Sequence, residues 1–378
     1  MIRRLLALCL LSLVPAVLAA QASQFGVRSL GLPALPVSAR SDGMAGGFGF
    51  FDPESALNPA AVSGLRRTTA GFNVRQFWRT SENPFGSASG NDTQFPLVMV
   101  GGPLGPKFNL AVSVAAYTDR TFALTYADTI QIRGEPVGVQ DTVFSRGGIN
   151  DIRVAVSYFV TPKLVVAGAV HALTGSNRFE YRRVFSDSAY ASLREETELS
   201  FAGPGLSAGV LAEVTKGLRL SGIFRWDGDV KFNKDSVRLA SLRMPFAFGG
   251  GLQWQSRRLM VSGHALARNW AVADSQIKAR GGVGSVNTVE YAAGMEYATH
   301  PVSPLSLPLR AGVRFAQLPF PLVTGSSGHE TIASLGTGFR FTGGRGSVDV
   351  ALQHAWRSQA GGYEERAFSL SLGVGIRP

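Results

Sequence analysis

The chain has 378 residues, of which 45% are hydrophobic, 17% are charged and 45 are glycine, and its formal net charge is +11. Soluble globular proteins carry about 25% charged residues, so this composition argues against an ordinary soluble domain. The basic residues are scattered rather than gathered in one patch with stacking aromatics, so the charge does not predict nucleic-acid binding. Contact with acidic lipid head groups or with a polar lumen is the simpler interpretation.

The N-terminus has the organisation of a secretory signal. Two arginines precede an apolar run from Leu5 to Ala20, and the following residues complete an A-x-A cleavage site. We therefore expect residues 1–22 to be a signal peptide that is removed on export; an anchor helix is the alternative, although the run is short for one. Cys9 is the single cysteine, so cleavage would leave no disulfide, thiol catalyst or cysteine zinc site.

Residues 23–66 differ from the rest of the chain because they are rich in glycine and proline and hold only short apolar groups. Asp52 and Pro53 are typical of a helix start, since aspartate caps the helix and proline suits its first position. The Asn-Pro pair that follows interrupts that helix, and a second short turn is expected from Pro59 to Gly64. We predict an N-terminal plug (hatch) that contains short helices.

After the plug, apolar residues alternate with small or polar residues at the period of a β-strand. In the last segment Phe368, Leu370 and Leu372 alternate with Ser369 and Ser371. Each segment has about the 9–11 residues that a tilted transmembrane strand needs. The predicted strands are 67–79, 93–103, 107–118, 150–160, 164–174, 204–214, 217–226, 244–254, 257–269, 288–298, 307–317, 331–341, 346–356 and 367–377.

Short turns and long polar links alternate between these strands, as in bacterial outer-membrane barrels. Short turns in the periplasm would put both chain ends there, which requires an even number of strands. Residues 120–148 leave that number open: a hairpin within the wall would make sixteen strands, whereas a projecting hairpin leaves fourteen, which we prefer. The predicted fold class is all-β, with a transmembrane antiparallel β-barrel of about 14 strands over residues 67–378.

The segment SARSDGMAGGFGFFDPESALNPAAVSGL, residues 38–65, resembles the plug region of the FadL-type long-chain fatty acid transporter family. In that family a glycine- and alanine-rich stretch and a short acidic helix precede Asn-Pro-Ala, which Asn58, Pro59 and Ala60 match here. Looser matches follow in the same order, so the resemblance covers nearly the whole mature chain. They lie at 217–226, 269–270, 289–297 and 307–315.

The resemblance implies a fourteen-stranded barrel with an N-terminal hatch and a lateral opening through which hydrophobic molecules leave into the membrane. The function it implies is passive uptake of hydrophobic small molecules such as long-chain fatty acids across the Gram-negative outer membrane, by a monomer in contact with membrane lipids and without a cofactor. One branch of the family serves type IX secretion as a shuttle, so a component that binds secreted proteins is the alternative. Unlike most such barrels, the chain does not end in an aromatic residue but in Arg377 and Pro378.

An enzyme is not expected; a membrane hydrolase with a dispersed Ser-His-Asn set is a distant third hypothesis. The histidines are isolated from one another and predict no metal site. Four tryptophans near predicted strand ends are expected in the interfacial girdles of the barrel. They are Trp226, Trp254, Trp270 and Trp356.

The candidate site residues lie in the plug. Phe48, Phe50, Phe51 and Leu57 are predicted either to face a hydrophobic ligand or to pack the plug against the wall. The tripeptide Asn58-Pro59-Ala60 joins plug to wall, and it is expected to serve as a turn, as a gate, or as both. These two interpretations are compatible, because a turn that fixes the plug also determines when the plug moves.

Overall fold

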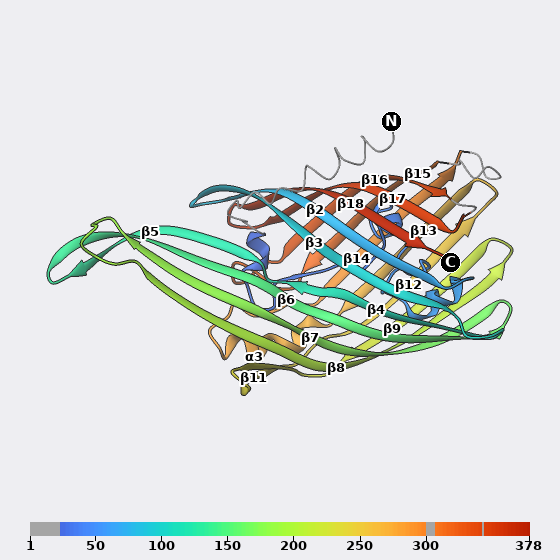
Figure 1. Cartoon of the computed structure of the whole chain (residues 1–378), viewed down its shortest axis with the longest axis horizontal. Coiled ribbons are helices and arrows are strands. Elements are labelled where there is room, and N and C mark those ends of the chain that lie inside the picture. Colours follow the sequence, from blue (N-terminus) through green and yellow to red (C-terminus); the bar gives the residue numbers. More distant parts are fainter. Residues whose placement is uncertain (1–22, 300–306, 342–343) are drawn as a thin grey trace.

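The computed structural model describes residues 23–299, 307–341 and 344–378. Fourteen antiparallel strands form a closed barrel, in which β18 pairs with β2 to complete the ring (Figure 1). The wall strands are β2 (Thr69–Asn83), β3 (Gly86–Pro103), β4 (Phe108–Asp119), β6 (Glu135–Thr161), β7 (Leu164–Phe185), β8 (Leu193–Thr215), β9 (Leu218–Asp227), β12 (Phe246–Gln255), β13 (Leu259–Arg268), β14 (Thr288–Ala298), β15 (Pro308–Leu318), β16 (Gly328–Phe341), β17 (Gly346–Gln359) and β18 (Tyr363–Ile376). The predicted fold class and the preferred count of fourteen are confirmed.

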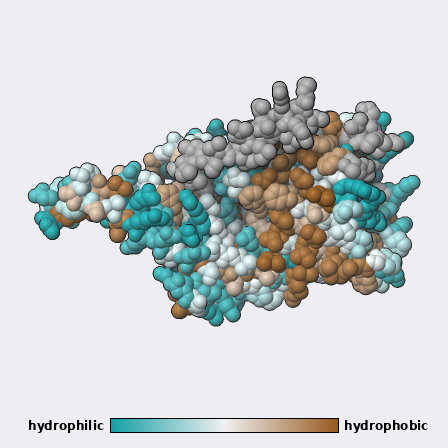
Figure 2. Space-filling model, viewed as in Figure 1, coloured by the Kyte–Doolittle hydropathy of each residue, from teal (hydrophilic) through white to brown (hydrophobic). Residues whose placement is uncertain are grey.

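Along the wall strands, apolar side chains on the outside alternate with small or polar side chains on the inside, as a membrane barrel requires. Phe368, Leu370 and Leu372 are exposed on the outside of β18, whereas Ser369 and Ser371 face inward and are buried. Figure 2 shows the resulting hydrophobic surface on the visible face of the barrel, with hydrophilic residues toward its two ends. Within the described residues, no helix has the length and hydropathy of a membrane-spanning helix.

Three of the four tryptophans lie exposed on the outer surface, as predicted: Trp226, Trp254 and Trp356. The prediction for Trp270 is wrong. This residue lies in the short helix η3 (Trp270–Ala273), is 1% exposed, and packs edge-on against Phe320 with ring centroids 5.1 Å apart. It belongs to an apolar cluster at the mouth of the barrel, so its position near a predicted strand end did not indicate an interfacial residue.

The N-terminal segment, residues 23–68, runs inside the barrel and packs against the inner face of the wall. It contains η1 (Gln24–Gly26), the two-residue strand β1 (Leu32–Pro33), α2 (Ala39–Asp42) and η2 (Pro59–Gly64). The turn predicted after Asn58 is confirmed as η2, for which Asn58 is the N-cap. The helix expected after Asp52 does not form. Asp52 Oδ1 accepts the N–H of Glu54 as a helix cap would, but the N–H of Ala56 donates to the carbonyl oxygen of Pro36 instead of continuing a helix, so the segment remains a turn.

Four strands continue beyond the wall as a twisted sheet, here called the arm (Figure 1). The arm consists of β5 (Phe122–Ile132), residues 135–147 of β6, 176–185 of β7 and 193–199 of β8. Residues 175–203, between the predicted strands 164–174 and 204–214, were expected to be one of the long polar links, and this prediction is wrong over most of their length. Gly147 (φ 118°) and Gly175 (φ 138°) lie where the arm leaves the wall, and these backbone conformations suit glycine alone.

A second hairpin, β10 (Val230–Lys234) with β11 (Val237–Leu242), pairs with β8 beside the arm. The long link between β13 and β14 folds into η3 and the short helix α3 (Asp274–Lys278). Together with the N-terminal segment, these elements surround the mouth of the barrel at the arm end. The C-terminus lies at the opposite end, where the strands are joined by short turns (Figure 1).

Candidate functional site

The ladder between β3 and β4 is interrupted on the arm side. The two strands pair from Pro103↔Asn109 up to Leu97↔Ala115 and no further. Beyond that point β3 pairs only with β2, and β4 pairs with β6. Pro96 lies at the break; since proline has no backbone N–H, it cannot donate to the ladder. The wall therefore has a lateral gap between β3 and β4, which we call the β3–β4 gap.

Two contacts cover this gap. β1 pairs with the free edge of β4, with Leu32 opposite Asp119 and Pro33 opposite Thr118. The Gln94 side chain on β3 donates a hydrogen bond across the gap to the Asp119 carboxylate. Behind them lies a cavity of about 60 Å³ lined by β1, Gln94, Pro96 and Asp119 among others. The gap is thus closed by a backbone contact of three residues, Leu32 to Ala34, and one side-chain bridge, far less than the full ladder that joins the other wall strands.

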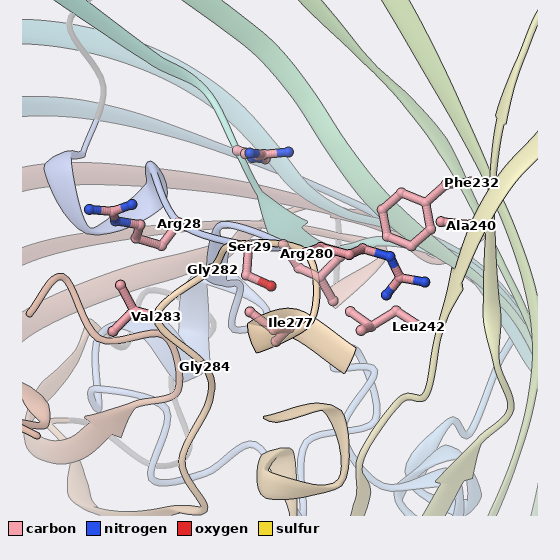
Figure 3. A pocket seen from close by; sticks show the side chains of 12 residues that line it. Arg28, Ser29, Phe232, Ala240, Leu242, Ile277, Arg280, Gly282, Val283 and Gly284 are labelled. Carbon is pink, nitrogen blue, oxygen red and sulfur yellow. The ribbon is translucent and has the colours of Figure 1, made fainter. Parts of the chain in front are cut away.

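A larger pocket of about 260 Å³ lies at the mouth of the barrel (Figure 3). Leu30, Leu242 and Ile277 form its apolar surface, and Figure 3 shows Arg280 pointing across toward Leu242. Arg28 and Arg120 add two more guanidinium groups, and none of the described lining residues is acidic. This mouth pocket combines apolar walls with positive charge, which suits an amphipathic anion.

Arg120 is the most buried of these three arginines. Its guanidinium lies 4.9 Å from the ring centroid of Phe179, in the arm. Its Nε atom is buried and has no hydrogen-bond partner among the described residues. Burial lowers the pKa of Arg120 to about 10, so the group remains protonated at neutral pH. A ligand carboxylate would supply the counter-charge that the described residues do not.

The aromatic residues predicted to face a ligand are packed between plug and wall. Phe48, Phe50 and Phe51 are each less than 5% exposed and belong to one apolar cluster with wall residues. Phe50 stacks on His264 of β13, with ring centroids 4.2 Å apart and planes 8° from parallel. Leu57 is half-buried and lines a cavity of about 50 Å³ next to Pro33 and other residues of the N-terminal segment. Leu57 thus borders an open space in this conformation.

The Asn58 side chain makes three hydrogen bonds, two within the N-terminal segment and one to the wall. Its Oδ1 accepts from the N–H of Ala60 at 2.9 Å, which caps η2. Its Nδ2 donates to the carbonyl oxygen of Phe50 at 2.9 Å and to Ser221 Oγ on β9 at 2.8 Å. Gly209 on β8 lets this side chain approach, because a Cβ there would lie 2.1 Å from Asn58 Oδ1. The Asn-Pro-Ala turn is thus held against β9 by a hydrogen bond from Asn58 to Ser221.

Elsewhere the lumen is lined by charges that neutralise one another. Glu290 pairs with Arg314 at 3.0 Å, Arg314 with Glu330 at 2.6 Å, and Glu330 with Arg357 at 2.5 Å, while Arg357 also binds Glu365. These five residues come from the consecutive strands β14 to β18. Such a polar lining gives a hydrophobic molecule little to bind, so the apolar surfaces of the mouth pocket are the better candidates.

A Ser-His-Asp set lies on the inner face of β6, β7 and β8. His171 Nδ1 lies 2.9 Å from both carboxylate oxygens of Asp151, and its Nε2 lies 2.8 Å from Ser207 Oγ. Asp151 also accepts a 2.7 Å bond from Arg225, which in turn pairs with Asp227. The set is therefore part of a larger ion-pair network, and we assign it to holding adjacent strands together. Within the described residues, no cluster of His, Cys, Asp or Glu is arranged to hold a metal ion.

Sequence reasoning missed the mouth pocket, because its residues are far apart in the chain. Arg28, Arg120 and Arg280 show no common motif, and their spacing predicts nothing by itself. The β3–β4 gap did leave a signal: Pro96 falls inside a predicted strand, where proline marks an edge or an irregularity.

Comparison with known proteins bears on both fold and family. The model of the BamG family matches residues 1–317, whereas a search of curated proteins finds no match. A FadL homologue from Pseudomonas aeruginosa has a similar structure, with a TM-score of 0.64 and 14% identity over 92% of this chain and 99% of that one. The CymD monoaromatic hydrocarbon channel gives 0.57 and 15% over 93% and 99%, and the P. putida toluene transporter TodX gives 0.55 and 12% over 85% and 93%.

Two of these three structures are named as a channel and a transporter, and none as an enzyme. At such low identities the similarity establishes the fold, which confirms the fold that the Asn-Pro-Ala resemblance implied. The family match extends over more than half of the sequence. The chain therefore belongs to the BamG family, and its barrel has the FadL-type outer-membrane fold.

Proposed function

We propose that the protein is an outer-membrane channel for the passive uptake of hydrophobic small molecules. The observation that carries this proposal is the β3–β4 gap, which lies at the arm side of the wall close to an apolar mouth pocket. A hydrophobic molecule gains nothing from a water-filled pore, but it can bind an apolar pocket and then enter the acyl chains through the wall. The fold shared with CymD and TodX, named as hydrocarbon and toluene channels, supports this use.

Long-chain fatty acids are the substrates we propose more specifically. The mouth pocket offers apolar contacts from Leu30 and Leu242 and positive charge from Arg28, Arg120 and Arg280. A fatty acid has the matching parts, a carboxylate and an acyl chain. A charge-assisted hydrogen bond to a guanidinium is among the stronger polar interactions, so the head group would fix the orientation of the ligand.

The proposal places the arm end outside the cell and the short turns in the periplasm, after removal of a signal peptide at residues 1–22. Residues 23–66 would act as the plug of a monomeric barrel formed by residues 67–378. Asn58-Pro59-Ala60 would set the position of the plug, and a shift of the plug would bring Phe48, Phe50 and Phe51 into contact with a passing ligand. The burial of these rings among wall residues supports a role in closing the path at rest.

Uptake by cells tests the proposal directly. The full chain would be produced in a Gram-negative host that lacks its own fatty-acid channel, and uptake of radiolabelled oleate and toluene would be measured. We expect uptake of oleate well above that of cells with an empty vector. Equal uptake in both strains for both compounds, with the protein folded in the outer membrane, would contradict the proposal.

The arm is the feature that favours the alternative, a component that binds secreted proteins. It provides an extended surface outside the wall, which a channel for small molecules does not require. Under this alternative, deletion of the gene would reduce protein secretion and leave the uptake of oleate and toluene unchanged. The same uptake measurement therefore distinguishes the two functions.

A further inference from the structure

The net positive charge of the protein is concentrated at one end of the barrel, although the basic residues are scattered along the sequence. The end opposite the arm, where short turns join the wall strands, is here called the short-turn end (Figure 1). Its turns, together with the link from η2 into β2, carry eight lysine or arginine residues and no aspartate or glutamate. We call them the rim cations, and they are Arg66, Arg67, Lys107, Lys163, Lys216, Arg257, Arg258 and Arg345.

The rim cations account for almost all of the charge imbalance of the chain. The formal net charge is +11, of which Arg3 and Arg4 in the expected signal peptide contribute two and the rim cations eight, so the rest of the chain carries +1. In the lumen the charges pair with one another, as in the row from Glu290 to Glu365. The excess charge therefore lies at the short-turn end rather than in the lumen.

The rim cations are exposed and have no counter-charge in the described part of the protein. All eight residues are exposed to solvent, and none of them forms an ion pair with a described residue. Arg377 at the same end, by contrast, pairs with Glu54 of the plug. At the arm end exposed charges neutralise one another, since Arg178 pairs with both Glu196 and Glu198. A surface that carries charge of one sign suits an anionic partner.

Backbone hydrogen bonds fix the positions of the rim cations. In three of the turns the carbonyl oxygen of the cation accepts a hydrogen bond from the N–H of a neighbouring strand. The pairs are Lys107 with Phe159 at 2.9 Å, Lys163 with Glu213 at 2.8 Å and Arg258 with Ala298 at 2.8 Å. The turns of Lys216 and Arg257 adjoin, because Gln255 N–H donates to the carbonyl oxygen of Gly217 at 2.8 Å. Adjacent turns are two strands, or about 10 Å, apart, so the charges form a fixed row along the edge of the barrel.

This row lies directly beyond the apolar outer surface of the wall. The Arg258 guanidinium donates a hydrogen bond of 3.4 Å to the hydroxyl of Tyr297, whose ring is exposed on the outside of β14. Lys107 directly precedes Phe108, which is exposed on the outside of β4. Cations at this height face the head groups of a bilayer whose acyl chains contact the apolar side chains.

We propose that the rim cations bind the phosphate groups of anionic phospholipids in the leaflet at the short-turn end of the barrel. An anionic phospholipid has both matching parts in the right order, a phosphate level with the cations and acyl chains level with Phe108 and Tyr297. A soluble acidic protein would cover the charges but not the apolar side chains beside them. This inference is independent of the substrate of the channel. In the orientation proposed above, the leaflet is the periplasmic one.

A tryptophan beside the rim cations tests this proposal on the full chain in lipid nanodiscs. Trp254 is exposed on the outside of β12, three residues before Arg257, and it pairs with Leu218, two residues after Lys216. The nanodiscs contain phosphatidylethanolamine and a small fraction of either phosphatidylglycerol or phosphatidylethanolamine with brominated acyl chains, which quench tryptophan on contact. The quenching that disappears in Trp254→Phe is the contribution of Trp254. We expect brominated phosphatidylglycerol to bind there at least about ten-fold more tightly than brominated phosphatidylethanolamine.

Two triple variants with the same change in net charge locate the site. Lys216→Gln/Arg257→Gln/Arg258→Gln removes the three rim cations nearest to Trp254, and it should reduce the preference for phosphatidylglycerol to less than about two-fold. The matched control Arg133→Gln/Lys234→Gln/Arg238→Gln removes three exposed cations at the arm end and should keep the full preference. Heat-modifiable migration on gels verifies that both variants keep the barrel.

Three results would overturn the proposal. Equal binding of the two lipids in the unaltered chain would leave the rim cations to another anionic partner, such as an acidic protein. An equal loss of preference in both triple variants would show that overall charge attracts the lipid and that the short-turn end does not. Loss of the preference on addition of inorganic phosphate, at constant ionic strength, would show that the ligand is a free anion. None of these results bears on the uptake of oleate or toluene, so the proposed function is tested separately.

Discussion

Positive charge at the mouth of the barrel comes from three arginines, and burial constrains Arg120 more than the other two. Arg120→Gln removes the charge and keeps most of the volume. Its affinity for a fluorescent fatty acid should fall about ten-fold, since a hydrogen bond to a charged group contributes about 1.5–3 kcal/mol. Binding of a neutral hydrocarbon should not change. Arg133→Gln, at the tip of the arm, is the matched control and should bind both ligands as the unaltered chain does.

The pKa of Arg120 adds a pH dependence to this prediction. Burial lowers its pKa to about 10, and the charged form is the one that binds a carboxylate. Fatty-acid affinity should therefore hold from pH 7 to 9 and decrease as the pH rises through about 10, while hydrocarbon affinity stays constant. A fluorescence titration with both ligands measures this difference. Parallel loss of both affinities would indicate unfolding rather than titration of Arg120.

Asn58 determines how firmly the plug is attached. Asn58→Ala removes the cap of η2 and both bonds from Nδ2, and it leaves Ser221 Oγ and the Phe50 carbonyl without this donor. We expect the free energy of unfolding to fall by about 1–3 kcal/mol, the usual cost of unsatisfied buried groups. Ser221→Ala loses only one of the three bonds and should cost less. If the turn also acts as a gate, Asn58→Ala alone will raise basal uptake.

At the scale of elements, glycines on the wall strands allow the plug backbone to approach the wall closely. A Cβ on Gly312 of β15 would lie 2.2 Å from the backbone carbon of Met44, whereas a Cβ on the outward Gly250 of β12 would lie 3.7 Å from its nearest neighbour. Gly312→Ala should therefore displace the plug and cost about 1–3 kcal/mol, as overpacking does. Gly250→Ala should be nearly neutral. Equal thermal unfolding of the two variants would show that plug and wall are not in close contact.

The arm is held together by an ion pair that acid should break. Two hydrogen bonds of 2.7 Å from Arg183 lower the pKa of Asp141 below its ordinary value of 3.8. Stability from a carboxylate with a lowered pKa is present above the ordinary value and is lost as the pH falls through the lowered one. Hydrogen exchange of the arm, corrected for the intrinsic rate, should therefore stay slow from pH 7 down to 3.8 and accelerate below it. Asp141→Asn should exchange faster at neutral pH already.

The wall strands were predictable, because lipid on one side and a polar lumen on the other impose a strict alternation over residues such as Phe368 to Leu372. The arm was not, because outside the membrane the same alternation is weaker and charged residues occur on both faces of the sheet, with Asp141 and Arg183 on one face and Arg182 on the other. The segments that contain Arg182, Arg194 and Glu196 were therefore predicted as a loop although they are strands. The helix expected after Asp52 failed for a different reason: a tertiary partner, the carbonyl oxygen of Pro36, accepts the Ala56 N–H that would have continued the helix.

For the whole molecule, the closed barrel was predictable from the sequence, but the proposed route of a hydrophobic ligand through it was not. The even count of strands followed from strand lengths and turn lengths. The mouth pocket gathers Arg28, Arg120 and Arg280 only after the barrel has closed, so no local pattern reveals it. The β3–β4 gap depends on pairing between strands, which sequence indicates only through Pro96.

The central claim is that hydrophobic molecules leave the barrel through the β3–β4 gap. A reversible thiol crosslinker between Gln94→Cys and Asp119→Cys, in a Cys9→Ser background, would fasten the two edges where these side chains already touch. Crosslinking Thr125→Cys to Thr142→Cys on the polar face of the arm is the control, since their hydroxyls lie 3.3 Å apart and away from the gap. Oleate uptake should fall at least about ten-fold when the gap is crosslinked and recover on reduction, with no change in the control. Unchanged uptake through a crosslinked gap would contradict the claim.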